Sequence, residues 1–423
     1  FLYGKVEEEI YVELPPGSKI DGKVCKLKKA LYGLKQAPRV WYNTLNKALS
    51  DIGFSPCVHD KAVFKKDSTF ILVYVDDLLI AGPDLELIKD VKQSLSDRFK
   101  MKDMGECEFF LGIGIERDRS KGTIKLTQKA HMKAMLERFG LLDANPAAMP
   151  FASGQKWEPT KPGFTAKSED RLKYQSMVGS LMYTMLGTRP DLSFAVSMAS
   201  RFCSNPSPQH HEHVKRIMRY ILGTLDAGLE YSGQDDNLVG YSDAEYAGDR
   251  SDSKSIGGYV FTIGSTAVSW RCKKQTTVAL STAEAEYTAV HYAVKEAVWL
   301  KEMMAYFGYP KDSILIRVDN QSAIKIANNP EMHEKTKHIR VQFHYTRDQV
   351  DAGYVNFLHI PGDQNPADIF TKVLGQTLFE KHALAMGMVG IREGRTKKEL
   401  LRTGADEALV RAFLGYLADR EKS

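Results

Sequence analysis

Residues 237–249 read NLVGYSDAEYAGD, a short apolar run that ends in a group of acids. The run is typical of a β-strand, and strand and helix patterns alternate from there to about residue 390. This alternation predicts an α/β domain in the order β-β-β-α-β-α-α-β-α. We expect its strands at 238–242, 258–263, 267–270, 314–318 and 354–359, and its helices at 281–307, 321–327, 338–350 and from 366 onward.

Four carboxylates take comparable places in that order. Asp243 ends the first strand, and Glu286 lies in the first turns of the long helix. Asp319 ends the fourth strand, and Asp368 follows the fifth. Since ligands gather at the ends of strands in α/β sheets, we expect these acids to converge. Four converging carboxylates can hold two Mg²⁺ ions, one activating a water and one stabilising a leaving oxygen, so the pattern predicts a phosphodiesterase site.

Taken singly, each acid also has a structural explanation. Ser281 and Glu284 match the Ser-x-x-Glu capping box, which gives Glu284 a structural role and leaves Glu286 as the better ligand. Asp319 could cap the helix that follows it, and Asp368 could interact with a helix dipole. The metal hypothesis therefore depends on the order of all four acids and not on any one of them.

A second acidic turn lies nearer the N-terminus. The stretch FILVYVDDLLIAG, residues 70–82, places Asp76 and Asp77 between two apolar runs. Paired carboxylates suit Mg²⁺, but neighbouring side chains point apart in extended chain, and Asp is also a favoured turn residue. The pair alone does not decide between a metal site and a plain turn. In the N-terminal half we expect strands at 70–75, 78–81, 109–116 and 124–126, and helices at 39–49, 85–99, 174–186 and 213–222.

Longer motifs around this turn resemble a known family. YVDD resembles the signature of reverse transcriptases, and LYGLKQAPRVWY, residues 31–42, resembles the template-positioning motif of copia-type retrotransposon polymerases. FKMKDMGECEFFLGIGIE, residues 99–116, is similar to that family's primer-grip region, and TRPDLSFAV, residues 188–196, also resembles copia-type sequence. The motifs occur in the family's order, and the resemblance covers about residues 1–390.

The resemblance implies the C-terminal part of a copia-type LTR retrotransposon Pol polyprotein, a multidomain α+β and α/β chain. The family's first catalytic aspartate and its fingers would precede residue 1, so we expect the polymerase half to be truncated and inactive alone. The implied parts are a partial reverse transcriptase palm and thumb at 1–150, a linker and helical connection at 151–232, a ribonuclease H-like mixed five-stranded sheet with flanking helices at 233–390, and a charged helical tail at 391–423.

The same resemblance assigns roles to residues that match the family's motifs. It implies Mg²⁺-dependent cleavage of RNA in RNA–DNA hybrids, with two Mg²⁺ ions per site and Mn²⁺ as a substitute. The catalytic and metal-binding quartet would be Asp243, Glu286, Asp319 and Asp368. Asp76, also a metal ligand, and Asp77 would be the polymerase remnant. Either His359 or Asp363 could belong to the loop that aids product release. The expected nucleic-acid contacts are Lys273, Lys274, Gln36, Lys35 and Arg340.

Composition excludes several classes of protein. The chain has 423 residues, 43% of them hydrophobic, which is enough for packed cores. Its net charge of +5 is compatible with a polyanionic partner. The five cysteines are widely spaced, which argues against a disulfide framework or a cysteine zinc site and favours a reducing compartment. No apolar run approaches the roughly 20 residues that span a bilayer, so we expect no membrane partner.

Other hypotheses remain beside the nuclease. The chain could be a degenerate, non-catalytic nucleic-acid-binding relic, and metal-dependent hybrid cleavage would separate the two. A structural partner protein built around a tail helix at 409–417 is a third alternative. The partners that the resemblance implies are an RNA–DNA hybrid, a primer–template and the rest of the Pol polyprotein. It also implies a cytoplasmic place in retrotransposon particles, with the nucleus as the alternative.

Overall fold

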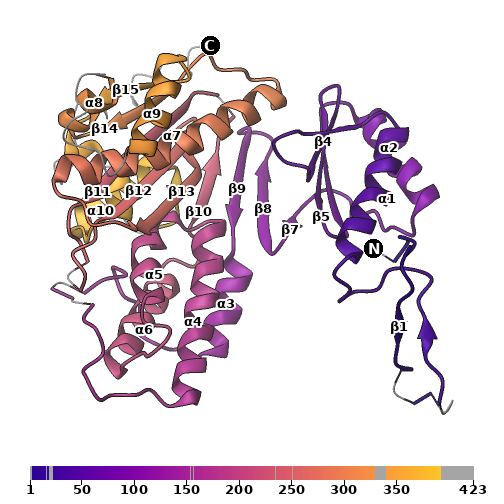
Figure 1. Cartoon of the computed structure of the whole chain (residues 1–423), viewed down its shortest axis with the longest axis horizontal. Coiled ribbons are helices and arrows are strands. Elements are labelled where there is room, and N and C mark those ends of the chain that lie inside the picture. The colour runs from indigo at the N-terminus through magenta and orange to yellow at the C-terminus, as the bar shows by residue number, and fades with distance from the viewer. Residues whose placement is uncertain are drawn as a thin grey trace. The chain divides into compact units, whose positions relative to one another are not determined.

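The computed structural model describes residues 2–15, 17–18, 22–152, 154–155, 157–233, 235–249, 251–328 and 340–391. It divides the chain into two compact units, one of residues 1–107 with 302–310, and one of residues 108–301 with 311–423. Figure 1 draws the elements of both. The predicted tail helix at 409–417 lies outside the described residues. Among the described helices, none is long and apolar enough to cross a membrane.

An antiparallel sheet and two helices form the first unit. The sheet has the order β3 (Ser55–Pro56), β4 (Val63–Lys66), β5 (Thr69–Tyr74) and β6 (Asp77–Ala81). The two helices, α1 (Ala37–Asp51) and α2 (Leu85–Arg98), confirm the helices expected at 39–49 and 85–99. The side chain of Asp84 accepts hydrogen bonds from two backbone N–H groups and caps α2. The core contains Trp41, Leu45, Leu49, Phe64, Ile71, Val91, Leu95 and Phe99. A separate two-stranded ribbon pairs β1 (Tyr11–Val12) with β2 (Cys25–Lys26).

Within the second unit, one sheet joins segments that lie far apart in the sequence. Its order is β16 (Met388–Val389), β10 (Gly228–Tyr231), β9 (Thr123–Thr127), β8 (Ile113–Asp118) and β7 (Phe109–Phe110). The prediction of one unbroken strand over 109–116 is wrong. Leu111 and Gly112 both have positive φ angles, 52° and 75°, so the chain turns there and forms two strands.

Four helices lie next to this sheet: α3 (Lys129–Arg138), α4 (Ser168–Gly187), α5 (Ser193–Ser200) and α6 (Pro208–Leu222). The helices expected at 174–186 and 213–222 are confirmed as parts of α4 and α6, whereas α3 and α5 were not predicted. Pro208 and the Ser207 cap explain why α6 begins where it does. Arg189 and Asp191 are buried beside these helices, with Arg189 Nε 2.9 Å from Asp191 Oδ1. The TRPD part of the 188–196 motif therefore has a structural role.

A second sheet of five strands carries the acids. Its order is β13 (Thr266–Lys274), β12 (Ile256–Ile263), β11 (Leu238–Glu245), β14 (Ile314–Val318) and β15 (Val355–His359). The first three strands are antiparallel, while β11, β14 and β15 run parallel, so the sheet is mixed, as expected. The helices are α7 (Thr282–Phe307), α8 (Gln321–Asn328), α9 (Arg340–Asp351) and α10 (Gln376–Ala385).

Two details of this sheet differ from the expectation. Strand β11 continues three residues past 242, so Asp243 lies within the strand. The helix expected from residue 366 is a short 3₁₀ helix, Pro366–Phe370, and α10 begins only at Gln376. The sheet also shares one hydrophobic core with the four helices: the Tyr220 and Phe379 ring centroids are 6.0 Å apart, and β10 pairs with β16.

Candidate active site

Three of the four expected acids meet at one edge of the mixed sheet. Asp243 in β11, Glu286 near the start of α7 and Asp319 just after β14 each offer a carboxylate oxygen, and these oxygens all lie within 4.8 Å of one another. Strands β11 and β14 are parallel neighbours, with Ser242 opposite Val318. Asp243 and Asp319, which follow these two residues, therefore lie at the same level of the sheet. This is the convergence that the sequence predicted.

The fourth acid, Asp368, is brought to the site by its 3₁₀ helix. Asn365 caps that helix by accepting a hydrogen bond from Ala367 N at 3.1 Å. Its Nδ2 donates to the backbone oxygen of Ser242 at 3.0 Å, which fastens the turn to β11 beside Asp243. Asp368 is 4% exposed and interacts electrostatically with Asp243 and Asp319. Asp368 therefore lies within electrostatic range of the three acids that meet.

Burial and mutual repulsion make full ionisation of this cluster unfavourable. Burial, followed by the charges of Asp243 and Asp319, raises the pKa of Glu286 to about 10. Burial and Asp243 raise the pKa of Asp368 to about 7, and the same two causes raise the pKa of Asp319. A bound cation would offset this repulsion.

The donor atoms fit divalent cations. Glu286 Oε2 and Asp319 Oδ1 are buried and have no hydrogen-bond partner among the described residues. Asp368 Oδ1 has none either, although Lys372 Nζ approaches it to 2.9 Å as an ion pair. Unpaired carboxylate oxygens are the ligands that Mg²⁺ prefers. The four acids would hold such ions, which when bound would activate a water and stabilise a leaving oxygen.

Two residues that the sequence did not single out also contact the cluster. The Thr371 hydroxyl donates a hydrogen bond to Asp243 Oδ2. Lys372 Nζ lies 2.9 Å from Asp368 Oδ1 and 3.7 Å from Asp243 Oδ2. Burial alone would lower the pKa of Lys372, but the neighbouring carboxylates outweigh burial and raise it. Both residues belong to the ADIFTK motif, where they follow Asp368 closely. This spacing was the sequence signal that could have identified them as part of the site.

The start of α7 explains the different roles of its two glutamates. Ser281 Oγ accepts a hydrogen bond from Glu284 N at 3.2 Å, as in a capping box. Glu284 Oε2 accepts from Leu280 N at 2.8 Å, one residue before the position that the motif predicts. The side chain of Glu284 is thus turned back along the chain, and Glu286 enters the acid cluster.

The loop after β15 borders the site. His359 is exposed, and its Nε2 lies 3.1 Å from the backbone oxygen of Asp319. Asp363 pairs with Lys381 at 3.3 Å. A Cβ at Gly362 would lie 3.3 Å from Asp319 Oδ2, so the backbone approaches the acid closely there. Of the two candidates, His359 is the one that contacts Asp319 and affects the pKa of its carboxyl.

The other acidic turn lies in the first unit. Tyr74 pairs with Asp77, so Val75 and Asp76 form a two-residue turn, with Val75 at a φ of 54° that is rare for a β-branched residue. Trp41 Nε1 donates to the Val75 oxygen at 2.6 Å, and the Tyr32 hydroxyl donates to Asp76. Asp76 and Asp77 are exposed. Among the described residues, no third acid forms a metal-binding group with them.

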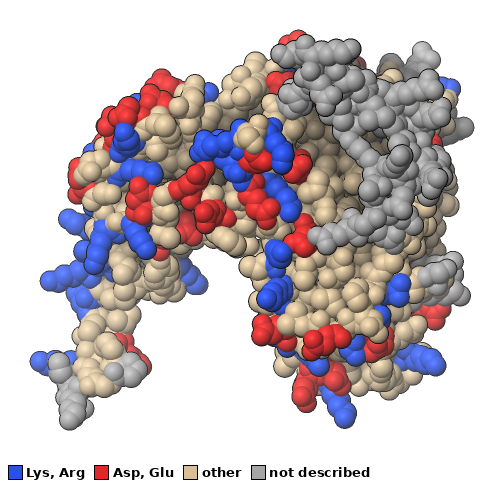
Figure 2. Space-filling view, turned by 180° about the vertical axis from the view of Figure 1, so that it is seen from behind, with Lys and Arg blue, Asp and Glu red and all other residues tan. Residues whose placement is uncertain are grey.

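The expected nucleic-acid contacts have different surroundings. Lys273 is exposed, but Lys274 Nζ lies 2.8 Å from Asp249 and 3.0 Å from Asp252, so its charge is largely paired. Lys35 is exposed and Gln36 partly buried, immediately before α1. Arg340 begins α9, and its side chain lies outside the described part of the chain. Figure 2 shows basic and acidic side chains interspersed on the face drawn there.

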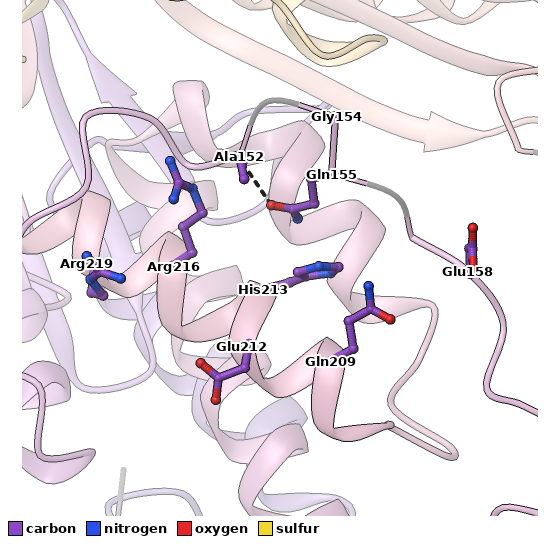
Figure 3. A pocket seen from close by; sticks show the side chains of 9 residues that line it. All are labelled: Ala152, Gly154, Gln155, Glu158, Gln209, Glu212, His213, Arg216 and Arg219. Atoms are coloured by element: carbon purple, nitrogen blue, oxygen red, sulfur yellow. Dashed lines mark hydrogen bonds between the residues drawn. The ribbon is translucent and has the colours of Figure 1, made fainter.

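A polar pocket of about 450 Å³ lies elsewhere in the second unit, between α6 and the residues Ala152, Gly154, Gln155 and Glu158 (Figure 3). None of the expected site residues lines it. Its lining residues are Ala152, Gly154, Gln155, Glu158, Gln209, Glu212, His213, Arg216 and Arg219.

The chain is similar to known reverse transcriptases and retrotransposon proteins. Residues 1–153 match the family described as reverse transcriptase (RNA-dependent DNA polymerase). The chain is 42% identical over 403 residues to the retrovirus-related Pol polyprotein from transposon TNT 1-94 of Nicotiana tabacum, covering 92% of this chain and 30% of the relative. It thus spans less than a third of that relative's length.

A shorter relative is covered almost completely. The chain is 34% identical over 308 residues to a putative transposon Ty5-1 protein of Saccharomyces cerevisiae, covering 70% of this chain and 98% of that protein. Among solved structures, the foamy viral protease-reverse transcriptase in complex with RNA/DNA hybrid is similar, with a TM-score of 0.51 and 15% identity. The match covers 84% of this chain and 42% of that one, and at this identity it shows the fold alone.

Proposed function

Since this chain belongs to the family of copia-type retrotransposon Pol polyproteins, we propose that residues 233–390 form a ribonuclease H that uses divalent metal ions to cut RNA in RNA–DNA hybrids. The observation that carries this proposal is the convergence of Asp243, Glu286 and Asp319, in which Glu286 Oε2 and Asp319 Oδ1 are buried and have no hydrogen-bond partner among the described residues. Buried acids that repel one another are typical of catalytic sites.

The family resemblance implies a role for each acid, and the contacts of Asp243 support a central one. Asp243 is central, because it interacts with the other three acids and receives the Thr371 hydrogen bond. Glu286 and Asp319 would hold the ion beside the leaving oxygen, and Asp368 the ion beside the attacking water. Thr371 fixes the orientation of the Asp243 carboxylate. His359, near Asp319, is the better candidate for a role in product release.

The substrate follows from the relatives and from the chemistry. The similar foamy viral enzyme was solved with an RNA/DNA hybrid, which supports a hybrid as the substrate here. Recognition would depend on A-like helix shape and 2′-hydroxyls, so base sequence should matter little. The test is cleavage of a labelled hybrid by the whole chain with Mg²⁺ or Mn²⁺. If the folded chain binds hybrids but cuts none with either metal, the proposal fails and a binding function takes its place.

The polymerase half is proposed to be inactive in this chain alone. Asp76 and Asp77 are adjacent, and among the described residues no third carboxylate joins them. Two metal ions need more ligands than one such pair supplies. Primer extension on an RNA template is the test, and synthesis that disappears in Asp76→Asn would contradict this part of the proposal.

A further inference from the structure

Lys372 supplies a positive charge within the acid cluster. It follows Asp368 by four residues, and its Nζ lies 2.9 Å from Asp368 Oδ1 and 3.7 Å from Asp243 Oδ2. Within the described part of the chain, no other lysine or arginine forms an ion pair with the four acids. One ammonium group therefore faces four carboxylates that lie in a largely buried site.

We infer that Lys372 is a resident counter-ion of the cluster, which stabilises the metal-free site and competes with divalent ions for its oxygens. The inference rests on the proposed function only in that the cluster must bind a metal. A cation between Asp243 and Asp368 would approach the oxygens that the ammonium group already neutralises. Because like charges repel, the ammonium group must weaken the binding of that cation.

Loss of this charge should have two opposite effects. Without metal, Lys372→Met leaves the acids to repel one another with less compensation, so the unfolding temperature should fall. With metal, the more negative cluster should bind the ion more tightly, by about tenfold for one nearby charge. If Lys372 had only a structural role, Lys372→Met would lower the unfolding temperature and leave the affinity for metal unchanged or weaker.

The experiment measures both quantities on the whole chain without nucleic acid. Unfolding temperatures are recorded in EDTA, and Mn²⁺ is titrated by calorimetry into wild type, Lys372→Met and Lys372→Arg. Lys372→Arg keeps the charge and should behave like wild type in both measurements. Lys311→Met is the matched control, since Lys311 pairs with Asp236 at 2.9 Å elsewhere in the same unit. If Lys372→Met does not fold, Lys372→Gln replaces it.

The outcomes separate this inference from the proposed function. Tighter Mn²⁺ binding by Lys372→Met, and not by Lys311→Met, supports the counter-ion. Unchanged or weaker Mn²⁺ binding overturns it, as does the absence of any Mn²⁺ binding by wild type. A wild-type chain that binds Mn²⁺ but cuts no hybrid overturns the nuclease and leaves the counter-ion in place.

The pocket beside α6 carries a second, independent inference. Arg216 Nε and Gln155 Nε2 are buried donors without a hydrogen-bond partner among the described residues, and His213 Nδ1 also has none. Gln155 Oε1 already accepts from Ala152 N at 2.9 Å, drawn as the dashed line in Figure 3, so only its amide nitrogen remains. Arg216 and Arg219 form no ion pair with a described residue. Burial and the charge of Arg219 lower the pKa of Arg216.

An anion is the ligand that fits such a pocket. Of its two acids, Glu212 is paired with Lys215 at 2.7 Å, and Figure 3 shows Glu158 across the pocket from the arginines. Guanidinium and amide groups bind phosphate oxygens well. We propose that the pocket holds a backbone phosphate of the nucleic acid. This proposal rests on the proposed function, because the hybrid substrate is the source of that phosphate.

The test compares two neighbouring charges on α6. Arg216→Gln should weaken binding of a hybrid in EDTA about tenfold and reduce the salt dependence of the affinity by about one phosphate contact. Lys215→Gln, which removes an exposed charge already paired with Glu212, should change the affinity less than twofold. If Arg216→Gln and wild type bind the hybrid with equal affinity, the phosphate contact is overturned, but the proposal of hybrid cleavage still stands. Pyrophosphate that stabilises wild type but not Arg216→Gln, with equal hybrid affinities, would make the pocket a small-anion site instead.

Discussion

Asn365 Nδ2 donates a hydrogen bond of 3.0 Å to the backbone oxygen of Ser242, the residue just before Asp243. Asn365 is fully buried, and its Oδ1 accepts from Ala367 N at 3.1 Å. One side chain therefore holds the turn that carries Asp368 against the strand that carries Asp243. The separation of these two acids depends on it.

Replacing this side chain should damage both stability and activity. Asn365→Ala leaves the Ser242 oxygen and the Ala367 N–H without partners, which should cost about 1–3 kcal/mol of unfolding free energy. The cleavage rate should fall by more than the loss of folded protein explains, because Asp368 is no longer held beside Asp243. Urea unfolding and cleavage rates measured on the same sample are the test. A stable variant with full activity would show that the turn is positioned by other contacts.

The buried pair of Arg189 and Asp191 should matter for folding and not for chemistry. Arg189→Met leaves the Asp191 carboxylate buried beside Tyr220 without its cation, so we expect a loss of about 3–5 kcal/mol of unfolding free energy. The double variant Arg189→Met/Asp191→Leu should recover part of this loss. Urea unfolding of the three proteins measures it. An unchanged midpoint for Arg189→Met would contradict the structural role of the TRPD motif.

The ion pairs around Asp249 should make the second unit sensitive to acid. Burial alone would raise the pKa of Asp249, but hydrogen bonds from Lys274 and Ser251 and the charge of Arg201 outweigh burial and lower it. A carboxyl whose pKa is lower in the folded state stabilises the fold above its ordinary pKa of about 4, and this contribution is lost as the pH falls.

Asp249→Asn should therefore lower the unfolding temperature near pH 7 and have less effect near pH 3. Thermal unfolding across this range is the measurement. Asp252→Asn is the comparison, because Asp252 also pairs with Lys274 but is more exposed than Asp249. Asp252→Asn should lower the unfolding temperature by a smaller amount. If Asp249→Asn lowers the unfolding temperature equally near pH 7 and near pH 3, the role of these ion pairs is contradicted.

The two glutamates at the start of α7 should respond differently to the same substitution. Glu286→Gln removes a metal ligand from the cluster and should reduce cleavage by about 100-fold or more. Glu284→Gln keeps an acceptor for Leu280 N and should be far milder. Cleavage rates at saturating Mg²⁺ compare them. Loss of cleavage in Glu284→Gln but not in Glu286→Gln would show that the second acid was assigned wrongly.

The sequence predicts the cluster well because strong apolar patterns mark the two strands and the helix that carry three of its acids. Asp243, Asp319 and Glu286 are positioned by β11, β14 and α7, whose approximate bounds the pattern predicts. Thr371, Lys372 and the contact of Asn365 with Ser242 were missed because a 3₁₀ helix positions these residues, and its spacing resembles the first turn of an ordinary helix. Their contacts with Ser242 and Asp243 join residues more than 100 positions apart.

Other misses have similar causes. Strands β10 and β16 are four and two residues long, so they show no readable alternation, and only their pairing defines them. The turn at Leu111 interrupts an apolar run because of its backbone conformation and not its residue type. The pairing of Lys274 with Asp249 is a tertiary contact between β13 and a loop, which no local pattern indicates.

Hybrid cleavage by the whole chain and its Asp319→Asn variant tests the central claim most directly. The substitution keeps the size of the side chain but removes a charge from a site where four acids repel one another. We predict that wild type cuts the RNA strand with Mg²⁺, and that Asp319→Asn loses about 100-fold or more of this activity while its unfolding temperature in EDTA is unchanged or higher. Equal cleavage by the two proteins, or no cleavage by a folded wild type with either metal, would contradict the claim.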